Sequence, residues 1–190
     1  MEKLYDVWAR RTPKWETKFQ EPIIEEFTNY RYGSGASAER RAKVYGGGYE
    51  IFIIAFFIGL YSRQTRALNE NPDKVTDFGQ PIQYWGNVGD RGKRREYSKL
   101  REYMFAALIA RTDIDFLALD KGEITLRKAV DILISKMEEY ANYGFYVLND
   151  LQKETPGYFF QNDAFFKVIN RIVSPETTDT NEEIVPPPLD

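Results

Sequence analysis

Residues 51–61 read IFIIAFFIGLY and form the longest apolar run in the chain. A helix from Tyr49 to about Leu68 that is apolar nearly all round in its first half is typical of a helix buried among others. The run is well short of the roughly 20 apolar residues that cross a bilayer, and hydrophilic sequence precedes it. We therefore expect it to form the central helix of the fold, with Gly59 allowing close packing against a neighbour.

Four further helices are predicted where apolar residues recur at helical spacing, over residues 22–30, 96–111, 125–153 and 162–173. The second of these carries an apolar stripe made of Leu100, Tyr103, Met104, Ala107 and Leu108. Thr125 is the expected N-cap of the third, in which Gly144 permits a close crossing or a bend. The predicted fold class is mainly α: a compact, single-domain helical bundle around the central apolar helix.

The stretch from Asn71 to Gly92 is rich in Gly, Pro, Asn and Asp and is too long to be a bare connector. Long loops of this kind usually carry a function or a small hairpin. Pro81 to Trp85 (PIQYW) has the composition of a short strand. A small β-hairpin within the 71–92 loop is therefore compatible with the sequence.

A chain of 190 residues is long enough for one core, so residues 1–173 are predicted to form a single helical domain. Residues 174–190 carry five acidic and no basic side chains, with prolines at 175 and 186–188. This composition predicts an acidic, proline-rich flexible tail.

The chain contains no cysteine and no histidine. Disulfides, thiolate metal sites, histidine-based triads and histidine zinc sites are therefore excluded, and we expect no metal site and no cofactor. The charged N-terminal residues include no apolar stretch leading to a cleavage site, so no secretory signal is expected. We expect a cytoplasmic protein without membrane contact.

The middle of the chain is basic, with 14 Lys or Arg against eight Asp or Glu between residues 31 and 111. Its densest part follows two aromatic residues, and together these form the candidate site: Tyr84, Trp85, Arg91, Lys93, Arg94, Arg95, Lys99 and Arg101. Guanidinium groups contact phosphates, and exposed aromatic rings stack on bases. The same pattern suits a protein-docking surface, or a solvated helix face beside core aromatics, and the sequence leaves these alternatives open.

Carboxylates offer the remaining route to catalysis. Glu16 and Lys18 have the Glu-x-Lys spacing of half a nuclease site, but no strand pattern or preceding aspartate completes it. The stretch from Asp113 to Glu123 begins like a calcium-binding loop, yet Leu117 and Ala118 stand where an oxygen ligand and a glycine are needed.

Two segments resemble a small bacterial family of accessory proteins associated with DNA phosphorothioation (Dnd-type) modification and defence gene clusters. The first is Tyr49 to Arg66 (YEIFIIAFFIGLYSRQTR), an apolar helix of the form F-x-x-A-x-x-x-G-L followed by basic residues. The second is Met137 to Leu151 (MEEYANYGFYVLNDL), and Pro81 to Trp85 lies between them in the same order as a similar stretch in that family. The resemblance implies a role beside DNA-modification or antiviral machinery and supplies no catalytic residue.

We therefore expect a non-catalytic accessory or scaffolding subunit of a bacterial DNA-modification or defence system, which binds DNA or a larger partner enzyme. Two alternatives remain: a small metal-dependent carboxylate enzyme such as a nuclease, and a purely structural homo-oligomer.

Overall fold

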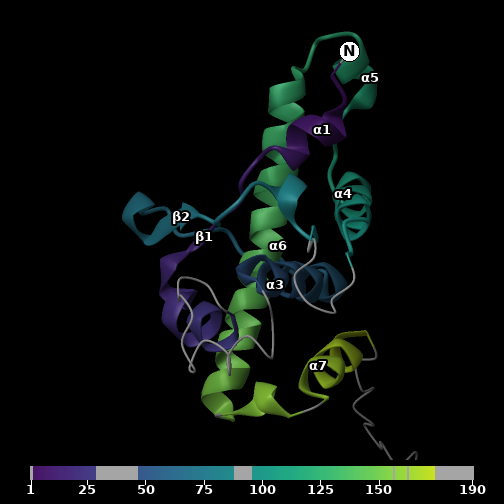
Figure 1. Ribbon diagram of the computed structural model, residues 1–190. Helices are drawn as coiled ribbons and strands as arrows, with labels where there is room; N and C mark the ends of the chain where they lie inside the picture. Colours follow the sequence, from purple (N-terminus) through teal and green to yellow (C-terminus); the bar gives the residue numbers. More distant parts are fainter. Residues whose placement is uncertain (1, 29–46, 88–95, 156, 162, 174–190) are drawn as a thin grey trace, which may run out of the picture.

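The computed structural model of this chain describes residues 2–28, 47–87, 96–155, 157–161 and 163–173, and within these ranges the protein is mainly helical. Its longest helix, α6 (Leu126–Glu154), extends over most of the length of the molecule (Figure 1). Thr125 caps its first turn, because the threonine hydroxyl accepts a hydrogen bond of 3.2 Å from the Lys128 amide. The predicted helix and its cap are confirmed.

The helix α3 (Gly48–Ser62) lies across α6 and buries ten of its 15 residues (Figure 1). The two helices meet at glycines. A Cβ atom on Gly59 would lie 2.2 Å from the Tyr140 carbonyl oxygen, and one on Gly144 would lie 1.9 Å from the carbonyl oxygen of Ala55. Each helix therefore presents a glycine to the backbone of the other, which confirms the close packing predicted at both positions.

The boundary predicted near Leu68 for this helix is wrong, because α3 ends at Ser62. Arg63 adopts a left-handed conformation with φ 54°, and the amide of Gln64 donates to the Gly59 carbonyl oxygen at 3.1 Å. A left-handed residue ends the helical hydrogen-bond pattern, and glycine is the usual residue at such a position. Arginine here is therefore a strained choice.

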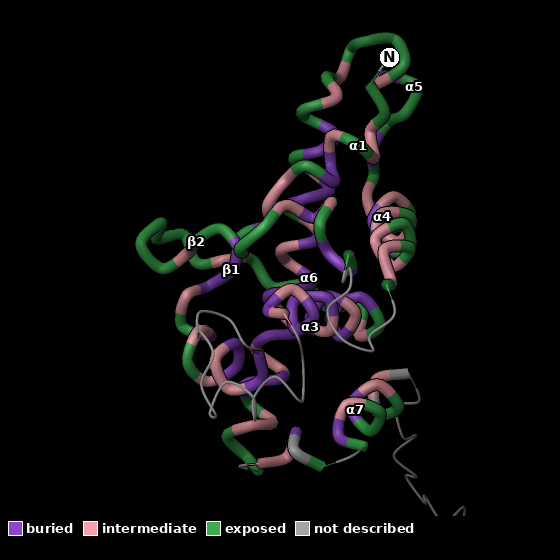
Figure 2. Tube along the Cα trace, viewed as in Figure 1, coloured by how far each residue is buried: buried purple, intermediate pink, exposed green. Residues whose placement is uncertain are grey.

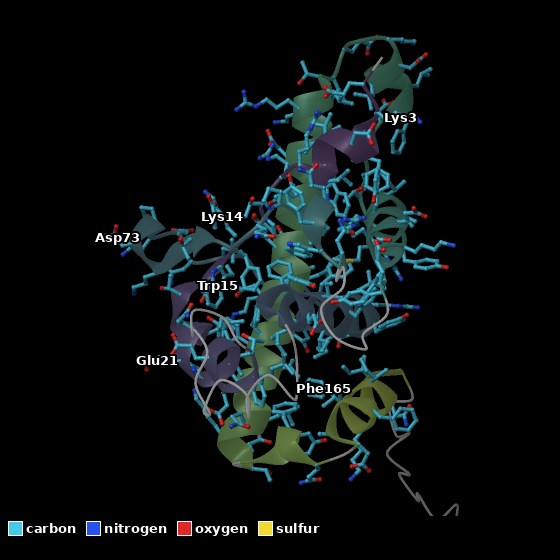
Figure 3. All side chains as sticks on the ribbon, viewed as in Figure 1. Lys3, Lys14, Trp15, Glu21, Asp73 and Phe165 are labelled. Atoms are coloured by element: carbon cyan, nitrogen blue, oxygen red, sulfur yellow. The ribbon has the colours of Figure 1, made fainter. Side chains whose placement is uncertain are left out.

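Two short strands, β1 (Lys14–Glu16) and β2 (Val75–Asp77), form an antiparallel sheet in which Trp15 lies opposite Thr76. Trp15 points inward from β1 (Figure 3), and its ring lies 5.2 Å from that of Phe78. The small sheet therefore closes the aromatic core on this side of α6.

A hairpin within the 71–92 loop is not what the structure shows, because β2 pairs with β1 from the N-terminal region. The stretch Pro81 to Trp85 is not a strand either. Its centre forms the 3₁₀ turn η4 (Ile82–Tyr84), in which Ile82 and the following Trp85 are buried. Burial of two side chains three positions apart suits one turn of helix better than the alternation of a strand.

The remaining elements cover the two ends of α6. Toward its N-terminal end lie α1 (Leu4–Ala9), α4 (Leu100–Ala110) and α5 (Phe116–Asp120), and near its C-terminal end lies α7 (Ala164–Val173) (Figure 1). Short 3₁₀ or π turns complete the described part of the chain: η1 (Thr17–Phe19), η2 (Gln20–Glu25), η3 (Pro72–Lys74) and η5 (Tyr158–Phe160). Buried residues, purple in Figure 2, include most of α3.

None of the described helices combines the length and the apolar character needed to cross a membrane. The tail predicted for residues 174–190 lies outside the described residues.

Candidate nucleic-acid interface

The eight residues of the predicted site fall into two groups. Four of them, Arg91, Lys93, Arg94 and Arg95, lie outside the described residues. The other four, Tyr84, Trp85, Lys99 and Arg101, belong to the two described stretches on either side of residues 88–95. The geometry of the site is therefore described from the residues on either side of this segment, here called its flanks.

Of the alternatives left open for Trp85, the structure supports a core aromatic and not a ring available for stacking. Its side chain is 1% exposed, and its indole N–H donates to the Gln80 carbonyl oxygen at 2.9 Å. Its ring packs against those of Phe52 and Tyr49 in the first half of α3. A buried tryptophan whose N–H is already paired belongs to the core.

The two flanks of the basic segment are joined directly. The Tyr97 amide donates to the Gly86 carbonyl oxygen at 3.1 Å. Gly86 has φ +80°, and a Cβ atom there would lie 3.0 Å from the Tyr97 carbonyl carbon. Glycine suits both the positive φ and this close approach, and the two ends of the segment, Gly86 and Tyr97, therefore meet at one place.

This junction is fixed to α3 by a buried acid. The Tyr97 hydroxyl donates to Glu50 Oε1 at 2.5 Å, and Glu50 is 7% exposed in the first turn of α3. Burial, and then the hydrogen bond to Glu50, raise the pKa of Tyr97 well above its ordinary value, so the hydroxyl remains a donor. The base of the basic segment is therefore held rigidly against the core.

Arg101 joins η4 to α4. Its guanidinium donates to the Gln83 carbonyl oxygen, and its Nε donates to the Ser98 carbonyl oxygen at 3.1 Å. This contact places Tyr84, the residue after Gln83, beside the start of α4. Arg101 thus serves first as a brace, whereas Tyr84 is 51% exposed and free to meet a ligand.

The outer side of α4 carries a residue that the sequence analysis assigned to the core. Tyr103 is 68% exposed, so its predicted place in the apolar stripe is wrong. The stripe is rotated toward Phe105, whose ring packs 5.3 Å from those of Tyr5 and Trp8 in α1. Tyr103 therefore lies one turn beyond Lys99, and both are exposed.

Glu16 and Lys18 belong to a polar cluster that joins distant parts of the chain. Glu16 is 3% exposed, and its Oε1 accepts hydrogen bonds from Asn142 Nδ2 at 3.0 Å and the Asn69 amide at 3.1 Å. Its Oε2 lies 2.8 Å from Lys18 Nζ and 3.3 Å from the Tyr146 hydroxyl. Every oxygen lone pair of this carboxylate thus has a protein partner.

Burial alone would raise the pKa of Glu16, but the hydrogen bonds from Lys18 and Asn142 outweigh burial and lower it. The group therefore stays charged and bonded. Glu16 itself belongs to β1, and its partners include Asn69 after α3 and Asn142 on α6, so the carboxylate ties these three parts of the chain together. This role in holding the fold leaves no free oxygen for a metal ion.

Glu138, on α6, is the one carboxyl group in the described residues whose pKa is raised toward neutral pH. Burial raises its pKa to about 7, although the Lys14 amide donates to it at 2.7 Å and the charges of Lys14 and Arg11 act in the opposite direction. The nearby Asp77 adds to the increase. A carboxyl group of this kind can exchange a proton near neutral pH.

The stretch that begins like a calcium loop has a structural use. Asp115 caps α5, because its Oδ1 accepts a hydrogen bond of 2.9 Å from the Ala118 amide. Across the described ranges, three or more acidic side chains do not gather in a group that could hold a metal ion.

Comparisons with protein-family models, with curated proteins and with solved structures give no match to this chain. The resemblance to the phosphorothioation-associated accessory family thus stays a prediction.

Proposed function

We propose that this protein is a non-catalytic accessory subunit that binds nucleic acid and works in the cytoplasm beside bacterial DNA-modification or antiviral defence enzymes. The observation that carries the proposal is the hydrogen bond between Tyr97 and Gly86. It brings together the two described ends of the basic segment, Gly86 and Tyr97, each two positions from a described candidate residue, Tyr84 or Lys99.

The charge of this region suits a phosphate backbone. Residues 88–101 contain six Lys or Arg and two Asp or Glu, in a chain whose net charge is -3. Concentrated positive charge on an otherwise acidic protein directs a polyanion to one site. Lys99 is exposed, and no carboxylate partner neutralises it among the described residues.

Two exposed tyrosines supply the other half of the interaction. Tyr84 and Tyr103 expose 51% and 68% of their surface, and both belong to the elements joined by Arg101. Aromatic rings in such positions stack on unpaired bases, and each stacked base contributes about 1–3 kcal/mol of binding free energy.

The accessory role rests on the resemblance and on the way the carboxylates are used. Glu16 and Asp115, which the sequence offered as candidates for catalysis or metal binding, both hold the fold through hydrogen bonds. The chemistry of a modification system would then belong to a larger partner, and this subunit would contribute contacts to DNA.

The test is a titration of the full chain against labelled single-stranded and duplex DNA. Replacing Tyr84 by Ala should weaken single-strand binding by about 5- to 100-fold and duplex binding by less, because stacking needs unpaired bases. Lys99→Glu should weaken both. The double variant Arg127→Glu, Lys128→Glu is the matched control, since these exposed residues lie at the N-terminal start of α6.

Equal weakening by the control would mean that overall charge, and not this surface, governs binding. Absence of DNA binding by the wild-type chain would contradict the proposal.

A second candidate is docking of a larger protein. The observation that favours it is the pair of adjacent exposed apolar residues on α5, Phe116 and Leu117, which are 45% and 63% exposed. Leu117→Asp should then abolish co-purification of the partner from native cells and leave DNA binding unchanged.

A further inference from the structure

An open groove of about 800 Å³ lies where the ends of α3, α4 and α7 meet. Leu60, Ala107 and Ile172 give it an apolar wall, and Tyr61, which is 54% exposed, adds an aromatic surface. The groove shares no lining residue with the interface around Tyr84, and none of the interactions described above uses it.

Two arginines line the same groove. Arg63 follows the last turn of α3, and Arg111 follows the last turn of α4. Both are exposed, and neither forms a salt bridge with another described residue. Arg63 also occupies a left-handed conformation, with φ 54°, which is unfavourable for a residue with a side chain. The groove is therefore apolar along one wall and positively charged at its rim.

The chain itself supplies a segment with the complementary character. Residues 174–190 carry five acidic and no basic side chains, and they begin two positions after Ile172, which lines the groove. Glu176 is four residues beyond Ile172, a span of at most about 14 Å. Three consecutive prolines, 186–188, lie between apolar residues, and proline-rich segments dock on aromatic-lined grooves.

We propose that residues 174–190 of this chain bind in the groove, with their acidic side chains paired to Arg63 and Arg111 and their apolar residues against Tyr61 and Leu60. Charge complementarity favours the acidic residues 174–190 as the occupant. A nucleic acid in the groove would be repelled by these acidic residues, because they follow directly after α7 at the groove's edge. The same segment is favoured over that of a second copy, because the covalent link to Ile172 gives it a high effective concentration.

The experiment is ¹⁵N relaxation on the full chain, read as backbone order parameters for residues 176–183. Docked residues should have order parameters of about 0.8, close to those of α6, whereas an undocked segment should fall below about 0.6. The double variant Arg63→Glu, Arg111→Glu should lower the values for residues 176–183 to the undocked range. The variant Arg127→Glu, Lys128→Glu should leave them at the wild-type level.

Reversing the charges on both sides of the proposed ion pairs distinguishes loss of docking from loss of folding, because only docking should be restored. Glu176→Lys and Asp179→Lys, added to the Arg63→Glu, Arg111→Glu chain, should restore the high order parameters. Low values in the wild-type chain would overturn the proposal, as would high values that survive reversal of both arginines. Order parameters that depend on protein concentration would assign the groove to the tail of a second copy and would also overturn it.

Discussion

Arg63 holds a backbone conformation that the sequence gives no sign of. Its φ of 54° is the only positive value at a non-glycine residue in the described chain. Removing the side chain's steric conflict gains about 1–2 kcal/mol, and the greater freedom of glycine in the unfolded chain costs about 0.4–1 kcal/mol. Arg63→Gly should therefore raise the free energy of unfolding by about 0.5–1 kcal/mol, measured by urea denaturation.

The matched comparison is Arg111→Gly, at a residue whose φ is -118°. This change relieves no strain and should lower the free energy of unfolding. If both glycine variants shift the urea midpoint equally, the left-handed conformation of Arg63 carries no cost.

Glu138 should make stability depend on pH. Its pKa rises from 4.5 to about 7 on folding, so the folded state binds more protons than the unfolded state between these values. Stability is therefore highest below about pH 4.5 for this group and falls as pH rises to about 7. Glu138→Gln keeps an acceptor for the Lys14 amide and removes the charge, so it should gain roughly 1–3 kcal/mol over wild type above pH 7.

The measurement is the difference in unfolding free energy between Glu138→Gln and wild type from pH 4 to pH 8. A difference that grows through this window supports the buried position of the carboxyl group. Parallel profiles would place Glu138 in ordinary solvent contact.

At the level of single residues, the sequence showed which side chains could bind a ligand better than it showed which of them are exposed to solvent. It identified Tyr84 and Lys99 as surface candidates, and both are exposed. It left open whether Trp85 lies at the surface or in the core, and the structure buries it; it placed Tyr103 in the apolar stripe, and that assignment was wrong. Whether Trp85 or Tyr103 is buried depends on the orientation of its turn or helix. Contacts with α3 and α1, which are distant in the sequence, set that orientation.

Among the elements, the crossing of α3 and α6 depends on two glycines that leave no room for a methyl group. Gly59→Ala would place a carbon 2.2 Å from the Tyr140 carbonyl oxygen, so the helices must separate. We expect a loss of about 1–3 kcal/mol or more, as for other overpacked cores. Ser135→Ala, on the exposed side of α6, is the control and should change stability by less than about 0.5 kcal/mol.

Thermal unfolding of these variants, together with Gly144→Ala and the double variant, tests the crossing. Because either methyl group already forces the helices apart, the double variant should lose less than the sum of the single losses. Strictly additive losses would mean that the two glycines do not share one contact.

The prediction that the apolar helix is the structural centre of the fold is tested at Phe56. Its ring is fully buried and lies 6.0 Å from the ring of Tyr140. Phe56→Ala should cost about 3–5 kcal/mol through lost burial and the cavity left behind. Phe166→Ala, at a ring that is 68% exposed on α7, is the matched control, and equal melting temperatures for the two variants would refute the prediction.

Elements with local signals were predicted well, and those that depend on distant partners were not. The cap at Thr125 and the helical apolar spacing after it are local, so α6 was located within one residue at each end. The strand β2 forms by pairing with β1, which lies about 60 residues earlier in the chain. No pattern within residues 71–92 therefore indicates this pairing. The 3₁₀ turn at Ile82 is likewise set by the core that it covers.

For the molecule as a whole, composition predicted the mainly helical class, and the arrangement came from contacts across long sequence distances. Glu16 illustrates this, because it joins β1 to Asn142 on α6 and to the Asn69 amide. The Glu-x-Lys spacing suggested a reactive pair, whereas the surrounding donors make it a structural one. Three separate segments must meet before that difference exists, so the spacing alone could not reveal it.

We propose that the basic segment between Gly86 and Tyr97, whose two ends are joined by a hydrogen bond, binds the phosphates of a nucleic acid. The most direct measurement is the salt dependence of duplex DNA binding by the wild-type chain and by Lys93→Glu, Arg94→Glu, with circular dichroism as the folding control. If both residues contact phosphates, the log-log slope of affinity against salt should decrease in magnitude by about 1.8 in the double variant. Equal slopes for wild type and a folded double variant would contradict the claim.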